Sequence, residues 1–137
     1  MNIRPGSLAL ASLALAVSAC ATIRDATPSV PVTIVSGGHV RVWSAYLREG
    51  EDAAVVRGMV APERLWRGPI SGHLHVAAFD AKGELIARTA ARWSGTLSGR
   101  HRHSAPFIAR LGFPRSQVAR LTVSYERGAH NASEGFQ

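Results

Sequence analysis

The sequence is poor in cysteine, lysine and aromatic residues. One cysteine, Cys20, stands in 137 residues, which excludes an internal disulfide and a zinc site built from several thiolates. Lys82 is the only lysine. Together with fifteen arginines it makes sixteen basic residues against nine acidic ones, a formal net charge of +7. Aromatic residues make up 7% of the chain, so a core must be built mainly from Val, Leu, Ile and Ala.

Catalytic signatures are also missing. The chain contains no G-x-S-x-G, no H-E-x-x-H and no glycine-rich phosphate loop, so we expect neither an enzyme nor a bound organic cofactor. Its length, with 46% hydrophobic and 18% charged residues, is typical of one folded domain. A multi-domain enzyme, a coiled coil and a transmembrane bundle are excluded.

The one long apolar run lies at the N-terminus, from Leu8 to Val17, and Arg4 is the only charge before Arg24. Ten helical residues span about 15 Å, roughly half of a bilayer core, so the run is too short to cross a membrane. A positive start, an apolar run and a small-residue end are typical of a secretory signal peptide, which we place at residues 1–19.

The segment Val17-Ser18-Ala19-Cys20 resembles the lipobox of small lipoproteins of Gram-negative bacteria. The resemblance implies that Cys20 carries lipid, becomes the new N-terminus and anchors the protein in the cell envelope. Ala21 is not the aspartate that retains lipoproteins in the inner membrane. We therefore expect an outer-membrane protein that faces the periplasm and has the membrane as its first partner.

The mature chain is predicted to form one all-β domain. Residues 20–31 are expected to be the lipidated cysteine and a linker, residues 32–127 an antiparallel β-sandwich of about seven strands, and residues 128–137 a disordered tail. The evidence is a series of short alternating or β-branched segments separated by Gly and Pro turns. The expected strands are 32–36, 39–47, 54–61, 72–80, 84–93, 105–111 and 119–127, with Gly58 a candidate bulge.

The clearest local signal is the turn from Asp80 to Gly83, which predicts a hairpin. In the simplest register Asp80 faces Gly83, so that Val76 meets Ala87 and His75 meets Arg88. This register buries Leu74, Val76, Leu85 and Ala87, and it turns His73, His75, Arg88 and Arg92 to solvent.

Several of these segments match a known type of domain. Val56-x-Gly58-x-Val60, the pair Phe79-Asp80 followed by Gly83, and Ser104-Ala105-Pro106-Phe107 resemble FxLYD-type and related Ig-like bacterial domains. That resemblance implies an Ig-like sandwich outside the cytoplasm that lacks enzyme activity.

Two histidine pairs are candidate metal ligands. His73 and His75 stand two apart on one expected strand, and His101 and His103 repeat the spacing in a later loop. Residues two apart on a strand share a face, so four imidazoles could converge on copper or zinc. The alternative is that these histidines are simply exposed, because no acidic residue lies close to either pair in the sequence to orient the rings.

Arginine dominates the second half of the domain. Between Arg88 and Arg127 there are eight arginines and one acidic residue, Glu126. Arginine binds phosphate and carboxylate in a bidentate manner, so Arg88, Arg92, Arg100 and Arg102 are candidate contacts for anionic envelope polymers. Nucleic acid is excluded as a partner because the chain is exported and no aromatic residues lie between the closely spaced basic ones.

Two functions therefore remain open. The first is a lipid-anchored, non-enzymatic binding or structural module that contacts envelope components or a partner protein. The second is a copper- or zinc-binding periplasmic lipoprotein that uses His73, His75, His101 and His103.

Overall fold

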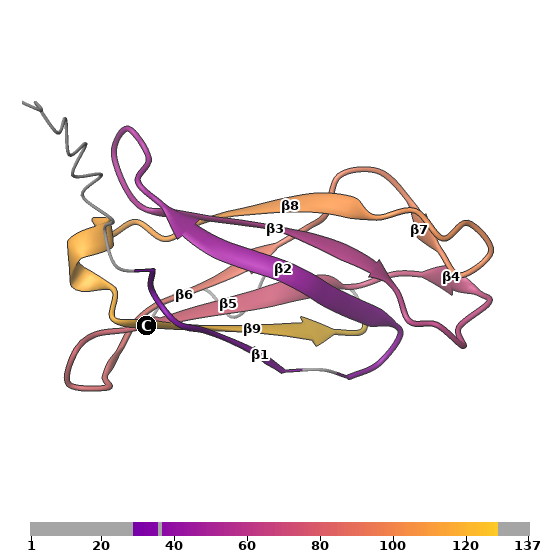
Figure 1. Cartoon of the computed structure of the whole chain (residues 1–137), viewed down its shortest axis with the longest axis horizontal. Coiled ribbons are helices and arrows are strands. Elements are labelled where there is room, and N and C mark those ends of the chain that lie inside the picture. Colours follow the sequence, from indigo (N-terminus) through magenta and orange to yellow (C-terminus); the bar gives the residue numbers. More distant parts are fainter. Residues whose placement is uncertain (1–28, 36, 129–137) are drawn as a thin grey trace, which may run out of the picture.

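The computed structural model describes residues 29–35 and 37–128, which form two β-sheets packed face to face (Figure 1). The four-stranded sheet has the order β1 (Val32–Val35), β9 (Arg120–Glu126), β5 (His73–Phe79) and β6 (Leu85–Ala91). The three-stranded sheet has the order β2 (Val40–Arg48), β3 (Val55–Pro62) and β8 (Ala105–Arg110). The predicted all-β sandwich is confirmed, and its two main sheets hold seven strands.

The connections add only short elements. Two-residue strands β4 (Pro69–Ile70) and β7 (Leu97–Ser98) pair with each other, and a single 3-10 turn covers Arg115–Gln117. The pairing of β1 with β9 is parallel, which departs from the antiparallel sheet expected from the sequence. The four-stranded sheet is therefore mixed.

The core lies between the two sheets and is aliphatic, apart from one buried aromatic ring. Strand β8 alternates buried and exposed residues along its whole length, as expected for a strand with one face in the core. The largest side chains that are almost fully buried are Phe107, Leu74, Leu97, Leu121, Val56, Val60, Val76 and Val123. All of them except Leu97, which lies on β7, come from the two main sheets, so neither sheet can bury its apolar face without the other.

The turn between β5 and β6 forms as predicted but contains one more residue. The Asp80 carboxylate accepts hydrogen bonds from the amides of Lys82 and Glu84, both at 2.9 Å. The amide of Gly83 donates to the Asp80 carbonyl at 3.0 Å, and Gly83 has a φ of +83°, which glycine adopts without strain. Asp80 consequently lies opposite Glu84 rather than Gly83.

The extra residue changes the predicted register of the hairpin. Phe79 pairs with Leu85 on the outer face, and a second one-residue shift follows between Ala78 and Phe79. Val76 therefore lies opposite Thr89 instead of Ala87. Because the two shifts add up to two residues, the side chains farther along β6 point to the predicted faces. Leu85 lies between the two shifts and is 50% exposed, so its predicted burial is wrong.

Gly58 is not a bulge, contrary to the sequence-based prediction. It pairs regularly with Ala45 and with Phe107, and the irregularity is in β2, between Val42 and Ser44. A Cβ atom at Gly58 would lie 2.5 Å from the Phe107 ring and closer still to the Ser44 carbonyl oxygen. Glycine is required there because the Phe107 ring packs directly over the backbone.

Three predicted segments fall outside the described residues: the signal peptide at 1–19, Cys20 with most of the linker, and nearly all of the tail at 128–137. Within residues 29–35 and 37–128, the structure contains no helix with the length and hydrophobicity needed to cross a membrane.

Candidate metal centre

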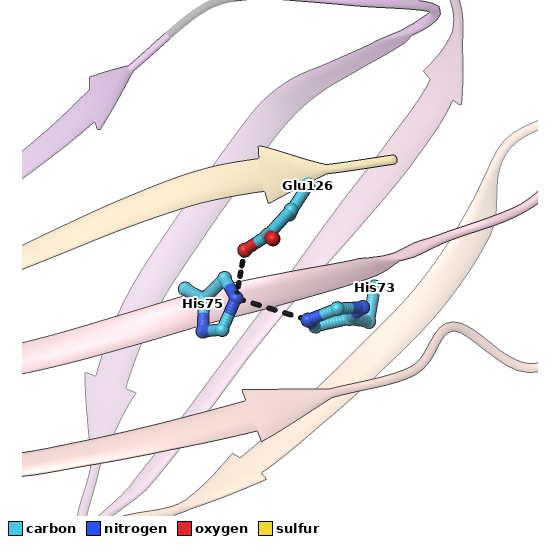
Figure 2. Close-up of side chains that lie close together, drawn as sticks. All are labelled: His73, His75 and Glu126. Atoms are coloured by element: carbon cyan, nitrogen blue, oxygen red, sulfur yellow. Dashed lines mark hydrogen bonds and ion pairs between the residues drawn. The ribbon is translucent and has the colours of Figure 1, made fainter. Parts of the chain in front are cut away.

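Three side chains meet on the outer face of the four-stranded sheet, where β5 begins and β9 ends (Figure 2). Leu74 and Val76 point into the core, so the alternation of β5 places His73 and His75 together on the opposite face. Strand β9 runs antiparallel to β5 and brings Glu126 directly opposite His73. Figure 2 shows the two imidazoles and the carboxylate turned toward one another.

The distances within this cluster are short. His75 Nε2 lies 2.9 Å from His73 Nε2 and 2.5 Å from Glu126 Oε2. The two imidazole rings are 4.5 Å apart between centroids and nearly perpendicular, at 70°. All three ligand atoms lie within 4.8 Å of one another. A metal ion with bonds of about 2.0–2.1 Å requires ligand atoms roughly 3.4 Å apart, so small side-chain movements would give that spacing.

The two short contacts at His75 Nε2 place different demands on that atom. His75 Nε2 carries at most one hydrogen, and one hydrogen can lie along only one of the two lines, to Glu126 or to His73. If that hydrogen points to the carboxylate, the nitrogen has no lone pair to offer His73. If the nitrogen is unprotonated, its lone pair faces the carboxylate oxygen. A divalent cation placed among the three atoms would accept a lone pair from each of them.

Burial differs across the three residues. His73 is 3% exposed, although the alternation places it on the outer face, so the prediction that it faces solvent is wrong. Its strand is central, with β9 on one side and β6 on the other, and its ring packs edge-on against His75. The side chains of His75 and Glu126 are 22% and 62% exposed. The cluster thus has a buried base and an accessible edge.

The donor set is chemically informative. Two imidazole nitrogens and one carboxylate oxygen form a common set of protein ligands for zinc and for other divalent transition metals. Carboxylate also balances charge, because it brings one negative charge to a surface that is otherwise rich in arginine. The arrangement can therefore hold a divalent cation at the surface of a rigid sheet.

The other two predicted ligands lie elsewhere. His101 and His103 are exposed in the loop after β7, with their ring centroids 6.4 Å apart. The Nε2 atom of His103 is 2.9 Å from the Thr96 carbonyl oxygen. Among the described residues, the ligand atoms that lie within 4.8 Å of one another belong to His73, His75 and Glu126. His101 and His103 are not part of this cluster.

The four arginines proposed as anion contacts are all exposed. Arg88 lies on β6 opposite Ala77, and Arg92 directly follows that strand. Arg100 and Arg102 lie in the loop with the second histidine pair, where Arg102 donates to the Arg64 carbonyl at 3.1 Å. Arg88 therefore lies on the strand beside the histidine cluster and Arg92 directly after it, whereas Arg100 and Arg102 lie in the loop after β7.

One titratable group next to the cluster is shifted. Burial raises the pKa of Tyr125 above its usual value of 10.0, and the nearby Arg127 partly offsets this rise. The Tyr125 hydroxyl donates to the Ser71 carbonyl at 2.7 Å. This bond ties the end of β9 to the residues just before β5, which holds the two strands that carry the cluster together.

Sequence reasoning missed Glu126. It lies 51 residues from His75, and only the pairing of β5 with β9 brings them together. A usable signal was present, because Glu126 is the one acidic residue among eight arginines in that half of the domain.

No protein-family model matches the chain, and comparisons with curated proteins and with solved structures also found no match. Function is therefore inferred from the side chains themselves.

Proposed function

We propose that the protein binds a divalent transition metal, zinc or copper, through His73, His75 and Glu126. The observation that carries this proposal is the convergence of the two Nε2 atoms and one carboxylate oxygen within 4.8 Å of one another. Imidazole suits both zinc and copper, so the donor set alone does not select between them. The protein acts as a binding module, and the metal is its ligand.

The same proposal places this module in the cell envelope. The lipobox Val17-Ser18-Ala19-Cys20 supports a lipid anchor, and Ala21 supports the outer membrane. A site on the sheet surface would then face the periplasm. The exposed positions of Arg88 and Arg92 support a contact with an anionic envelope polymer next to the metal site.

Isothermal titration calorimetry of the purified full chain with Zn(II) and Cu(II), after treatment with a chelator, tests the proposal. One equivalent of metal should bind. His75→Ala and Glu126→Gln should each weaken binding by at least about tenfold, because each removes one of three ligands.

His101→Ala is the matched control, because it removes an equally plausible histidine from an exposed loop outside the cluster. It should leave the affinity unchanged. If His101→Ala weakened binding as much as His75→Ala, the metal would be held by the two histidine pairs and not by this cluster. Absence of any binding heat together with unchanged thermal stability would disprove the proposal.

A further inference from the structure

The outer face of the three-stranded sheet, on the other side of the molecule from the metal cluster, combines arginines with exposed apolar side chains. Its residues lie in rows across β2, β3 and β8. One row is Tyr46, Arg57 and Ile108, and the row beside it is Arg48, Val55 and Arg110. Ser44, Met59 and Pro106 form the next row, and Arg41 and Trp43 follow on β2.

Three large apolar side chains on this face are exposed to solvent. Trp43 is 55% exposed, Ile108 51% and Tyr46 44%. Tyr46 and Ile108, together with Met59 and Pro106, line a shallow hollow of about 160 Å³. The Arg48 guanidinium lies 5.3 Å from the centre of the Tyr46 ring, so charge and ring are closely mixed.

The charges on this face have one sign. Arg41, Arg48, Arg57 and Arg110 are exposed, and β2, β3 and β8, which are described in full, contain no acidic residue. Acidic side chains lie beyond both ends of the face: Glu49, Glu51 and Asp52 in the loop after β2, and Glu63 directly after β3. The positive surface is therefore the part of the face that lies on the three strands themselves, between these acidic residues.

We propose that this face docks on an anionic phospholipid bilayer. Trp and Tyr place their amphipathic rings at the level of lipid headgroups, and guanidinium groups bind phosphates in a bidentate manner. Each basic residue near an anionic membrane strengthens docking about fivefold. Trp43, Tyr46 and Ile108 would contact the apolar edge of the bilayer, and the four arginines would contact its phosphates.

A second copy of the chain fits this face less well. In a twofold dimer the face would meet itself and bring eight arginines together, with no acidic residue on the three strands to balance them. An anionic bilayer supplies the missing negative charge. Docking on the bilayer does not depend on metal binding, because the two sites are on different sheets.

Quenching of tryptophan fluorescence by lipids with brominated acyl chains tests the proposal on the full chain reconstituted in vesicles. Subtracting the signal of Trp43→Phe from that of the unmutated chain leaves the contribution of Trp43, because Trp66 and Trp93 are present in both proteins. We expect quenching of Trp43 in phosphatidylglycerol vesicles and little in phosphatidylcholine vesicles. Raising the salt from 0.1 to 1 M should abolish it, because the screening length falls from about 10 to about 3 Å.

Arg57→Glu should lower the ratio of docked to undocked protein by roughly thirtyfold, since reversing a charge removes two charge contributions. Arg120→Glu is the matched control, because Arg120 is an exposed strand arginine on the outer face of the other sheet. It should retain the quenching. Equal quenching in both lipids, no quenching of Trp43, or equal losses in the two variants would overturn the proposal. A Trp43 signal that follows protein density and not lipid composition would identify a dimer interface instead.

Discussion

At the level of single residues, His75 has the central position in the cluster of His73, His75 and Glu126. Its Nε2 atom contacts both His73 and Glu126, whereas those two residues face each other across the strand pair. His73 supplies a buried ligand, and Glu126 supplies an accessible one. The three residues therefore differ in their accessibility: His73 is buried, Glu126 is exposed, and His75 contacts both.

Metal binding should stabilise the fold in a pH-dependent way. Zinc at about one hundred times its dissociation constant should raise the free energy of unfolding by about 2.7 kcal/mol, because it binds the folded state. Protons compete with the metal for imidazole nitrogen, so this increment should shrink as the pH falls from 7.5 to 5.

Urea unfolding at both pH values, with zinc and with a chelator, measures this effect. His75→Ala should show no increment at either pH. An increment of the same size in that variant would mean that zinc stabilises the fold through other groups.

Two of the three residues in the cluster could be predicted from the sequence. The spacing of His73 and His75 places both imidazoles on one face of any strand. The place of Glu126 beside the histidines was not predicted, because the pairing of β5 with β9 joins segments about fifty residues apart; its standing as the one acidic residue among eight arginines was the only signal. Exposure of His73 was predicted incorrectly, since the period of two reveals the face of a residue but not what packs on that face.

At the level of elements, the β5–β6 hairpin offers a direct test of its two register shifts. Leu74 is fully buried and Leu85 is 50% exposed, although a simple hairpin would bury both. Leu74→Ala should therefore destabilise the domain by about 2–5 kcal/mol. Leu85→Ala should cost less than about 1 kcal/mol, as surface changes usually do. Chemical denaturation of the two variants measures both values, and similar losses would support the simpler register.

Gly58 should tolerate no side chain. Gly58→Ala places a Cβ atom against the Phe107 ring and the Ser44 carbonyl, and we expect a loss of about 1–3 kcal/mol or more. Gly37→Ala is the control, because a Cβ there meets nothing within 4 Å. Thermal unfolding should show a much lower melting temperature for the first variant alone. A small effect at Gly58 would mean that Phe107 can move away from the backbone.

The strands themselves were predictable, and their pairing was not. All seven main strands lie within one or two residues of the segments expected from alternation and turns. The parallel partner of β1 was not expected, because Val32–Val35 is equally compatible with any neighbour. The shift at Ala78 was not expected either, since a bulge depends on how both sheets fit the core.

At the level of the whole molecule, the two sheets have different surfaces. The four-stranded sheet carries the metal cluster, and the three-stranded sheet carries the exposed Trp43 among arginines. A protein that rests its three-stranded sheet on a membrane turns the cluster away from that membrane. Metal in the surrounding solution would then reach the site without passing the docked face.

Lipidation is the most direct test of where the protein acts. Cys20 lies outside the described residues, so the evidence for it is the lipobox alone. Cys20→Ser should remove labelling by palmitate and leave the signal peptide uncleaved, because the modified sulfur is lost. Labelling with palmitate in cells, followed by gel electrophoresis, measures both effects. Normal labelling of the variant would rule out this anchor.

The parallel pairing of β1 with β9 has a mechanical consequence. Val32 lies beside Leu121 at the start of β9, while Glu126 lies at the far end of the same strand. A tension between an N-terminal anchor and a ligand held at Glu126 would run along the strands. It would load the bonds of the β1–β9 ladder together, in shear, instead of breaking them one after another. A tethered domain of this form should resist pulling along its strands far better than peeling from its edge.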